Sequence, residues 1–171
     1  MFKLKALSAD AIPKAQAKAD RYRLLNDPRD AESICRDILR TDPENQNALR
    51  TIILALTDQF GKAMRVNIGH VEEMIPRLTD EYARCYYKGL AYERWAFAQF
   101  REETPGYVVY DWLVQAMKLY EQAEALSPPD VEDAVLRYNA CARIIKRNDQ
   151  LRPRPEDETA DACWQDDVPM A

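Results

Sequence analysis

The sequence predicts an all-α fold of about seven helices in a single domain, residues 1–151. The chain has only four glycines in 171 residues. It is rich in alanine, leucine, arginine, glutamate and glutamine, which favour helices over strands. Apolar residues recur at helical spacing along most of the chain, and turns that contain proline or glycine separate these stretches. A chain of this length can bury an adequate core without a metal or a disulfide.

The first two helices are expected to form an antiparallel pair. Ser8 can cap a helix that continues to Asn26, where an Asp-Pro dipeptide ends it. Asp30 can cap the second helix. That helix has to stop before Pro43, because a proline disfavours helical geometry in the residue that precedes it.

The next pair is less regular. A third helix is expected over residues 45–60, with apolar residues at 48, 49, 52, 53 and 56, and Gly61 ends it. Residues 62–75 are expected to supply its partner. Gly69 and Pro76 both lower helix stability there, so we expect a break or a bend in this fourth helix.

Two long helices and a last helix complete the domain. The long helices are expected over about residues 79–103 and 108–127, joined by a Thr-Pro-Gly turn. A helix over about residues 130–148 would cover the exposed end of the array. Residues 152–171 carry two arginines against six carboxylates and three prolines. This acidic tail has too little apolar surface to offset the chain entropy, so we expect it to be disordered.

A repeated spacing relates the first pair of helices to the long pair. In both, a small residue precedes a tyrosine by three positions, and an alanine, a bulky residue and a proline follow in the same order. Tyr92 and Ala116 lie 24 residues apart where Tyr22 and Ala31 lie 9 apart, which is an insertion of 15 residues. Shared between two helices, it lengthens each by roughly 10 Å, so this pair should project beyond its neighbours. The residues of the two sets are Ala19, Tyr22, Ala31, Cys35 and Pro43, and Gly89, Tyr92, Ala116, Tyr120 and Pro128.

This spacing resembles the tetratricopeptide-repeat (TPR) family, and the chain is similar to small bacterial members of that family. Residues 21–26, 31–39, 56–60, 86–89 and 139–143 carry the resemblance. The resemblance implies a right-handed α-solenoid with one elongated hairpin and a C-terminal capping helix. It also implies a concave groove that binds a peptide or protein segment, and it supplies no catalytic activity.

Charge and composition disfavour several functions. The chain has a net charge of −5, and residues 1–151 account for only −1 of it. Such a domain lacks the positive field that nucleic-acid binding needs, so nucleic acid is an unlikely partner. No stretch is apolar for about 18 residues, and no signal peptide precedes the first helix, so we expect a cytoplasmic protein without membrane contact. Four scattered cysteines and the single His70 offer no set of metal ligands, and no cofactor is expected.

If the repeat register is right, the first helix of each pair lines the concave side and presents polar and aromatic side chains. Arginine and asparagine can bind peptide groups directionally, and tyrosine adds contact area at low entropic cost. We therefore predict a non-catalytic scaffold that binds a protein or peptide partner. The alternative is an ordinary solvated helix face. The predicted groove residues are Asp20, Arg23, Asn47, Arg50, Asp58, Tyr86, Glu93, Arg94 and Tyr138.

The long hairpin carries 11 of the 16 aromatic residues, more than two paired helices can bury. Phe97, Phe100, Tyr107 and Tyr110 must cover another part of the chain or form an apolar patch. Such a patch would suit a partner or a second copy, in a homodimer formed through the long hairpin. Alternatively, the fourth helix and the acidic tail fold back over it.

Charged residues inside the long helix favour a structural interpretation. Glu93 and Asp58 are expected to pair with Arg94 or Arg50 and to fix the register of the helices, rather than to act as an acid and base pair. We therefore do not predict an enzyme. An RNA-associated helical repeat protein that uses arginines and tyrosines is the first alternative. A small-ligand-binding or enzymatic helical domain is the second.

Overall fold

The computed structural model describes residues 2–61 and 66–154, and these residues contain helices and no β-strand. The all-α prediction is therefore confirmed for this part of the chain. The predicted disorder of the tail concerns mostly residues 155–171, which lie outside the described residues. The elements are η1 (Ala9–Ala11), α1 (Ile12–Leu24), α2 (Pro28–Thr41), α3 (Gln46–Thr57), α4 (Ile68–Glu72), η2 (Ile75–Arg77), α5 (Glu81–Arg101), α6 (Gly106–Ala125) and α7 (Asp133–Arg147).

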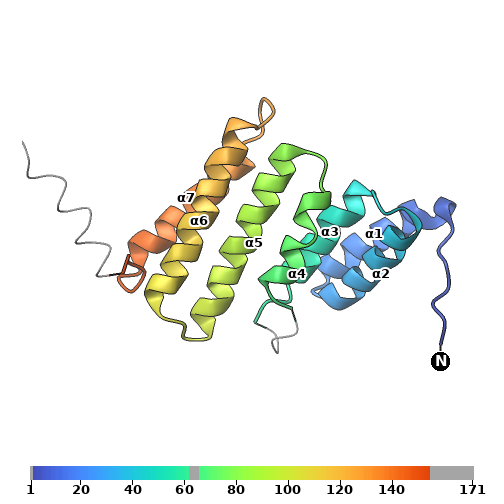
Figure 1. Cartoon of the computed structure of the whole chain (residues 1–171), viewed down its shortest axis with the longest axis horizontal. Coiled ribbons are helices and arrows are strands. Elements are labelled where there is room, and N and C mark those ends of the chain that lie inside the picture. The colour runs from blue at the N-terminus through green and yellow to red at the C-terminus, as the bar shows by residue number, and fades with distance from the viewer. Residues whose placement is uncertain (1, 62–65, 155–171) are drawn as a thin grey trace, which may run out of the picture.

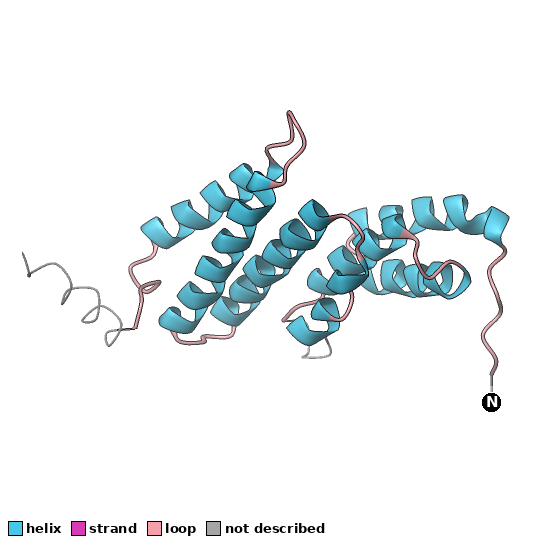
Figure 2. Ribbon diagram, turned by 45° about the horizontal axis from the view of Figure 1, so that its top comes forward, coloured by secondary structure: helices cyan, strands magenta, loops and turns pink. Residues whose placement is uncertain are grey.

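The helices follow one another along the long axis of the molecule, from α1 and α2 at one end to α6 and α7 at the other (Figures 1 and 2). Helix α1 packs on α2, and α5 packs on α6. The odd-numbered helices also contact one another in sequence, α1 with α3, α3 with α5, and α5 with α7. Helices α5 and α6 have 21 and 20 residues, so they form the longest pair, as the insertion predicts.

Two of the predicted helix caps are wrong. Helix α2 begins at Pro28, and the cap is Asp27, whose carboxylate accepts a hydrogen bond from the Asp30 amide at 3.4 Å. The reason is that proline, with its fixed φ and missing N–H, suits the first position of a helix. Ser8 makes no side-chain hydrogen bond to a helix end, and a 3-10 turn precedes α1 instead.

Other helix ends have local explanations. The side chains of Asn45 and Asp80 accept hydrogen bonds from backbone amides three residues later and so cap α3 and α5. Helices α1 and α5 end with Asn26 and Glu103 in the left-handed region, at φ of 60° and 59°. In both cases the next amide bonds back to the helix, which closes a Schellman motif.

The fourth helix is broken, as Gly69 and Pro76 predict. In place of one helix over residues 62–75, the described residues form the five-residue α4 and the 3-10 turn η2. Pro76 lies in the first turn of η2 and has no N–H to continue the hydrogen bonds of α4, which separates the two elements. Residues 62–65 lie outside the described residues.

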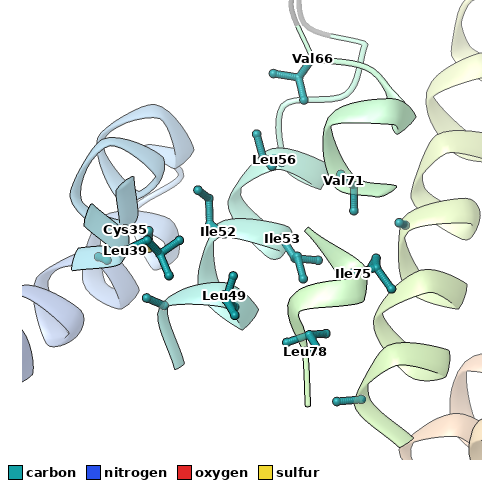
Figure 3. Close-up of a cluster of buried hydrophobic side chains, with 14 of the residues drawn as sticks. Cys35, Leu39, Leu49, Ile52, Ile53, Leu56, Val66, Val71, Ile75 and Leu78 are labelled. Atoms are coloured by element: carbon teal, nitrogen blue, oxygen red, sulfur yellow. The ribbon is translucent and has the colours of Figure 1, made fainter. Parts of the chain in front are cut away.

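The core consists of two clusters of buried side chains that share α5. The first cluster joins α1, α2, α3 and residues 66–78, here called the α4 segment, to one face of α5 (Figure 3). The α5 residues in this cluster are Ala83, Ala91 and Ala98. The second cluster joins α6 and α7 to another face of α5 through Tyr92 and Ala96. Helix α5 is therefore buried on two faces and connects the two halves of the fold.

The small residue that starts the second motif marks a close approach of α5 to α6. A β-carbon on Gly89 would lie 2.9 Å from the ring carbon Cε1 of Tyr120 and 3.3 Å from the carbonyl oxygen of Ala116. Ala116 and Tyr120 are fully buried. In the first pair of helices the matching residues Ala19, Ala31 and Cys35 are also fully buried. The repeated spacing thus identifies side chains that lie between paired helices.

We predict that Gly89→Ala lowers the stability of the protein. An alanine gains about 1 kcal/mol of helix propensity over glycine. The contact with the buried Tyr120 ring costs about 1–3 kcal/mol, and this term should dominate. Asn139→Ala is the control, because it raises propensity at an exposed position of α7. Urea unfolding should show a lower midpoint for Gly89→Ala only, and an unchanged or higher midpoint would contradict the close approach.

Buried thiols predict a loss of stability at alkaline pH. Burial raises the pKa of the Cys35 and Cys141 thiols from 9.0 to about 12. An unfolded chain loses these protons near pH 9, so the free energy of unfolding should fall as the pH rises from about 9 to 12. The double variant Cys35→Ala and Cys141→Ala should show a smaller fall in chemical unfolding experiments across this range. An equal fall would mean that other groups cause it.

Candidate functional site

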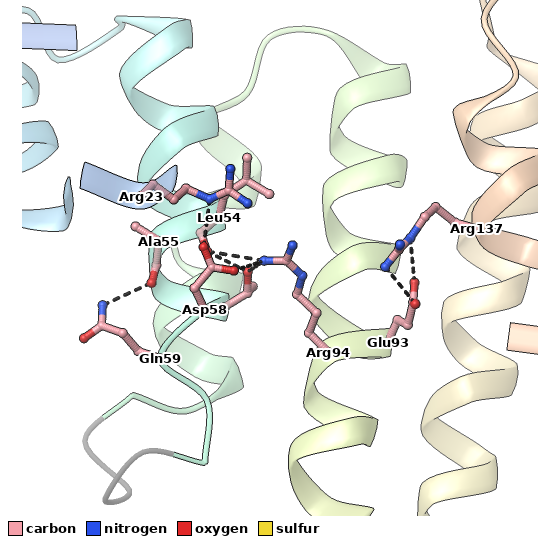
Figure 4. A network of polar contacts seen from close by, with 9 residues as sticks. Arg23, Leu54, Ala55, Asp58, Gln59, Glu93, Arg94 and Arg137 are labelled. Atoms are coloured by element: carbon pink, nitrogen blue, oxygen red, sulfur yellow. Dashed lines mark hydrogen bonds and ion pairs between the residues drawn. The ribbon is translucent and has the colours of Figure 1, made fainter. Parts of the chain in front are cut away.

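Asp58 is the centre of a polar network that connects three helices. It lies at the C-terminal end of α3, and its Oδ1 accepts a hydrogen bond from Arg94 Nη1 of α5 at 2.5 Å. Arg23 Nε of α1 lies 2.8 Å from the Oδ2 atom (Figure 4). Arg94 Nη1 also donates to the Thr57 hydroxyl at 2.6 Å. The predicted pairing of Asp58 with Arg94 is confirmed, and Arg23 joins it.

The network carries more positive than negative charge. Each of the three side chains is about one quarter exposed. Burial lowers the pKa of Arg94, Asp58 opposes this shift, and the neighbouring Arg23 adds to it. A guanidinium group keeps its positive charge in proteins. Two cations therefore share one carboxylate.

A hollow of about 560 Å³ opens beside this network, between the end of α3 and the second half of α5. Its volume lies within the usual range of ligand sites. Aromatic and small side chains form part of the wall, and charged side chains form the rest, so the hollow can accommodate a side chain with both apolar and ionic parts. The lining residues are Thr57, Asp58, Phe60, Gly61, Arg94, Phe97, Ala98, Arg101 and Glu102.

Asp20, another predicted groove residue, has partners within the chain. The Thr51 hydroxyl donates to its Oδ1 atom at 2.9 Å, and Gln16 Nε2 donates to the same atom at 3.0 Å. Gln16 also donates to the Thr51 hydroxyl at 2.9 Å. This triad connects α1 to α3. The geometry therefore supports a role for Asp20 in positioning these two helices.

Three tyrosines gather at the start of α5. The rings of Tyr82 and Tyr86 are stacked with centroids 5.8 Å apart, and Tyr87 meets Tyr86 edge-on at 5.4 Å. They line a smaller hollow of about 240 Å³ together with Arg50, Asp80, Ala83 and Asp133. Burial raises the pKa of Tyr82 to about 12, and Asp133 contributes to the shift. The Arg50 Nε and Tyr82 hydroxyl atoms are buried and have no hydrogen-bond partner among the described residues.

Glu93 does not face the groove, and the expectation that it pairs with Arg94 or Arg50 is wrong. It is 2% exposed and accepts two hydrogen bonds from Arg137 of α7, at 2.8 and 3.0 Å. The Tyr120 hydroxyl of α6 donates a third at 2.6 Å. Burial and the nearby Glu93 charge raise the pKa of this hydroxyl, so it stays protonated and donates. Adjacent residues on a helix point about 100° apart, which turns Glu93 away from Arg94.

The remaining predicted residues are spread over the surface and the second core cluster. Asn47 is exposed at the start of α3, and Tyr138 is half-buried against the second cluster. Phe97 also packs against that cluster and lines the larger hollow. Phe100 and Tyr107 are each 36% exposed. A homodimer through the long hairpin stays a prediction.

Other aromatic residues of the long hairpin pack within the chain. Trp95 meets Phe60 of the first half edge-on at 5.2 Å, and Tyr92 meets Trp112 of α6 at 5.0 Å. The Tyr92 hydroxyl donates to Glu72 of the α4 segment at 2.7 Å. The broken fourth helix therefore contacts α5 near Tyr92, while Phe100 and Tyr107 of the predicted patch stay partly exposed. The predicted covering of the patch by the acidic tail concerns mostly residues outside the described ranges.

Two arginines, Arg101 and Arg137, are not among the residues predicted from the sequence. Arg101 lies seven residues after Arg94, which places both on one face of α5, and this spacing could have identified it. Arg137 lies 44 residues from Glu93, and no local pattern relates them.

No protein-family model, curated protein or solved structure matches this chain. Among residues 2–61 and 66–154, no helix combines the length and apolar character needed to cross a bilayer. The same residues contain no group of three or more histidine, cysteine or acidic side chains placed to hold a metal ion. The chemistry that the site offers is hydrogen bonding and ion pairing from guanidinium groups beside an apolar wall.

We predict that Arg137→Met destabilises the protein strongly, because it leaves the buried Glu93 carboxylate with one partner. Removal of one partner of a buried ion pair costs about 3 kcal/mol or more. The double variant Glu93→Gln with Arg137→Met removes the unpaired charge and should recover part of this loss. Urea unfolding monitored by circular dichroism tests both. Equal midpoints for the wild type and Arg137→Met would show that the ion pair contributes little to stability.

Proposed function

We propose that this protein is a non-catalytic scaffold of the tetratricopeptide-repeat type, which binds a protein or peptide segment along its odd-numbered helices. In this proposal the helices form a right-handed solenoid, α5 and α6 are an elongated repeat, and α7 caps the array. The observation that carries the proposal is the convergence of α1, α3 and α5 at the Asp58 network, beside the 560 Å³ hollow.

The packing supports the repeat architecture. Small side chains occupy the helix crossings in both complete pairs, Ala19 and Ala31 in the first and Gly89 and Ala116 in the long one. The chain of contacts from α1 to α3, α5 and α7 gives one continuous layer of first helices. Such a layer is the usual binding surface of helical-repeat proteins.

The chemistry of the layer supports a polypeptide partner. The larger hollow places guanidinium donors next to Phe60 and Phe97, and the smaller one places Arg50 next to three tyrosines. Arginine and tyrosine beside apolar contacts are the residues that most often dominate protein interfaces. Both hollows lie between α3 and α5, so one bound segment can reach both.

The stacked pair of Tyr82 and Tyr86 is the observation that favours the RNA alternative, because bases stack on such rings. The carboxylates of Asp80 and Asp133 line the same hollow and would repel a phosphate backbone. A polypeptide partner, which can avoid this repulsion, therefore fits the hollow better.

A photo-cross-linking residue tests the proposal. At position 47, on the exposed start of α3, it should trap a polypeptide in lysate from the source organism. At position 36, on the exposed surface of α2, the same residue should trap much less. Adducts whose added mass is removed by nuclease would favour RNA. Equal trapping at both positions would contradict a binding face on the odd-numbered helices.

A further inference from the structure

We propose that the larger hollow binds a glutamate side chain of an extended partner segment. This inference rests on the proposed function and adds to it the chemical class of the partner. Three observations support it: unused hydrogen-bond donors, the charge around the hollow, and the different charge of the smaller hollow, which lies at the other end of the contact between α3 and α5.

The arginines of the larger hollow keep donors free. Every hydrogen bond of Arg94 to the described residues starts from Nη1, so its Nη2 and Nε groups have no acceptor there. Arg101 lines the same hollow, is exposed, and has no ion-pair partner in the described ranges. A carboxylate has two oxygen atoms that match the paired donors of a guanidinium group.

The charge around the hollow also selects an acid. Arg94 and Arg101 line the hollow together with Asp58 and Glu102, which balance their charges. Arg23, which pairs with Asp58 from α1, adds a third positive charge beside the hollow. An incoming carboxylate balances the excess, whereas an incoming lysine would add a fourth cation. The Phe60 and Phe97 rings offer apolar surface for the methylene groups of a glutamate.

The smaller hollow has an excess of negative charge instead. It combines Arg50 with the carboxylates of Asp80 and Asp133, so it disfavours an acidic side chain. Arg50 and Asp58 are eight residues apart on α3, which corresponds to about 12 Å along the helix. An extended segment covers this distance in about four residues at about 3.3 Å each. The bound segment should therefore carry an acid at one position and none about four residues away.

A random-peptide display library selected on the full-length protein tests this inference. Enriched peptides should share an acidic residue, with neutral residues about four positions away on one side. A synthetic enriched peptide, with a fluorophore for anisotropy measurements, should lose about tenfold in affinity when this acid becomes the corresponding amide. A second acid four positions away on that side should also weaken binding.

Variants of the protein assign the loss to the hollow. Arg94→Gln should weaken the same peptide about tenfold, and Arg101→Gln about threefold, because Arg101 is exposed. Arg101 has no partner in the described residues, so its replacement leaves the Asp58 network intact. Arg143→Gln makes the same charge change on the exposed surface of α7 and should have no effect. The amide peptide should show little further loss with Arg94→Gln.

The outcomes separate the two proposals. Enriched peptides without an acid, or acidic peptides whose affinity is unchanged by Arg94→Gln and Arg101→Gln, would overturn the glutamate site and leave a peptide-binding scaffold in place. If the library yields no peptide that the photo-cross-linking residue at position 47 can trap, both the peptide-binding scaffold and the glutamate site would be overturned.

Discussion

The buried charge of Glu93 constrains the whole second half of the fold. A carboxylate that is almost fully removed from water costs several kcal/mol unless several donors surround it. Tyr120 and Arg137 supply these donors from two other helices, so α6 and α7 must lie where both side chains reach one point on α5. The next residue, Arg94, reaches Asp58 on the opposite side. Two neighbouring residues of α5 thus connect it to both halves of the molecule.

In the proposed function, this arrangement prepares the larger hollow to bind a partner without much rearrangement. Arg94 is oriented by Asp58, by the Thr57 hydroxyl and by the α3 backbone before any partner arrives. A side chain that is already ordered loses little entropy on binding, which favours affinity and specificity. Arg101 lacks such support and contributes charge rather than shape. The hollow therefore combines one fixed guanidinium group with one adaptable guanidinium group.

The sequence predicts the helices well because their limits are local. Prolines, glycines and cap residues act within a few positions, and the break near Pro76 follows from the same rules. The pairing of Asp58 with Arg94 could be predicted, because the expected repeat register places α3 beside α5. The partners of Glu93 could not be predicted from the sequence. They depend on the rotation of α7 relative to α5, and no sequence periodicity predicts that rotation. Asp27 rather than Asp30 caps α2 because Pro28 suits the first helical position, which leaves the preceding residue as the cap.

The sharing of α5 between the two core clusters has a consequence for folding. The two clusters share no buried residue, so the core has two packing units with α5 as a common wall. Damage confined to α2 or α7 weakens one unit directly, whereas damage to α5 weakens both. Local opening therefore begins most easily at the ends of the molecule, and the amide protons of α5 should be the last to exchange with solvent.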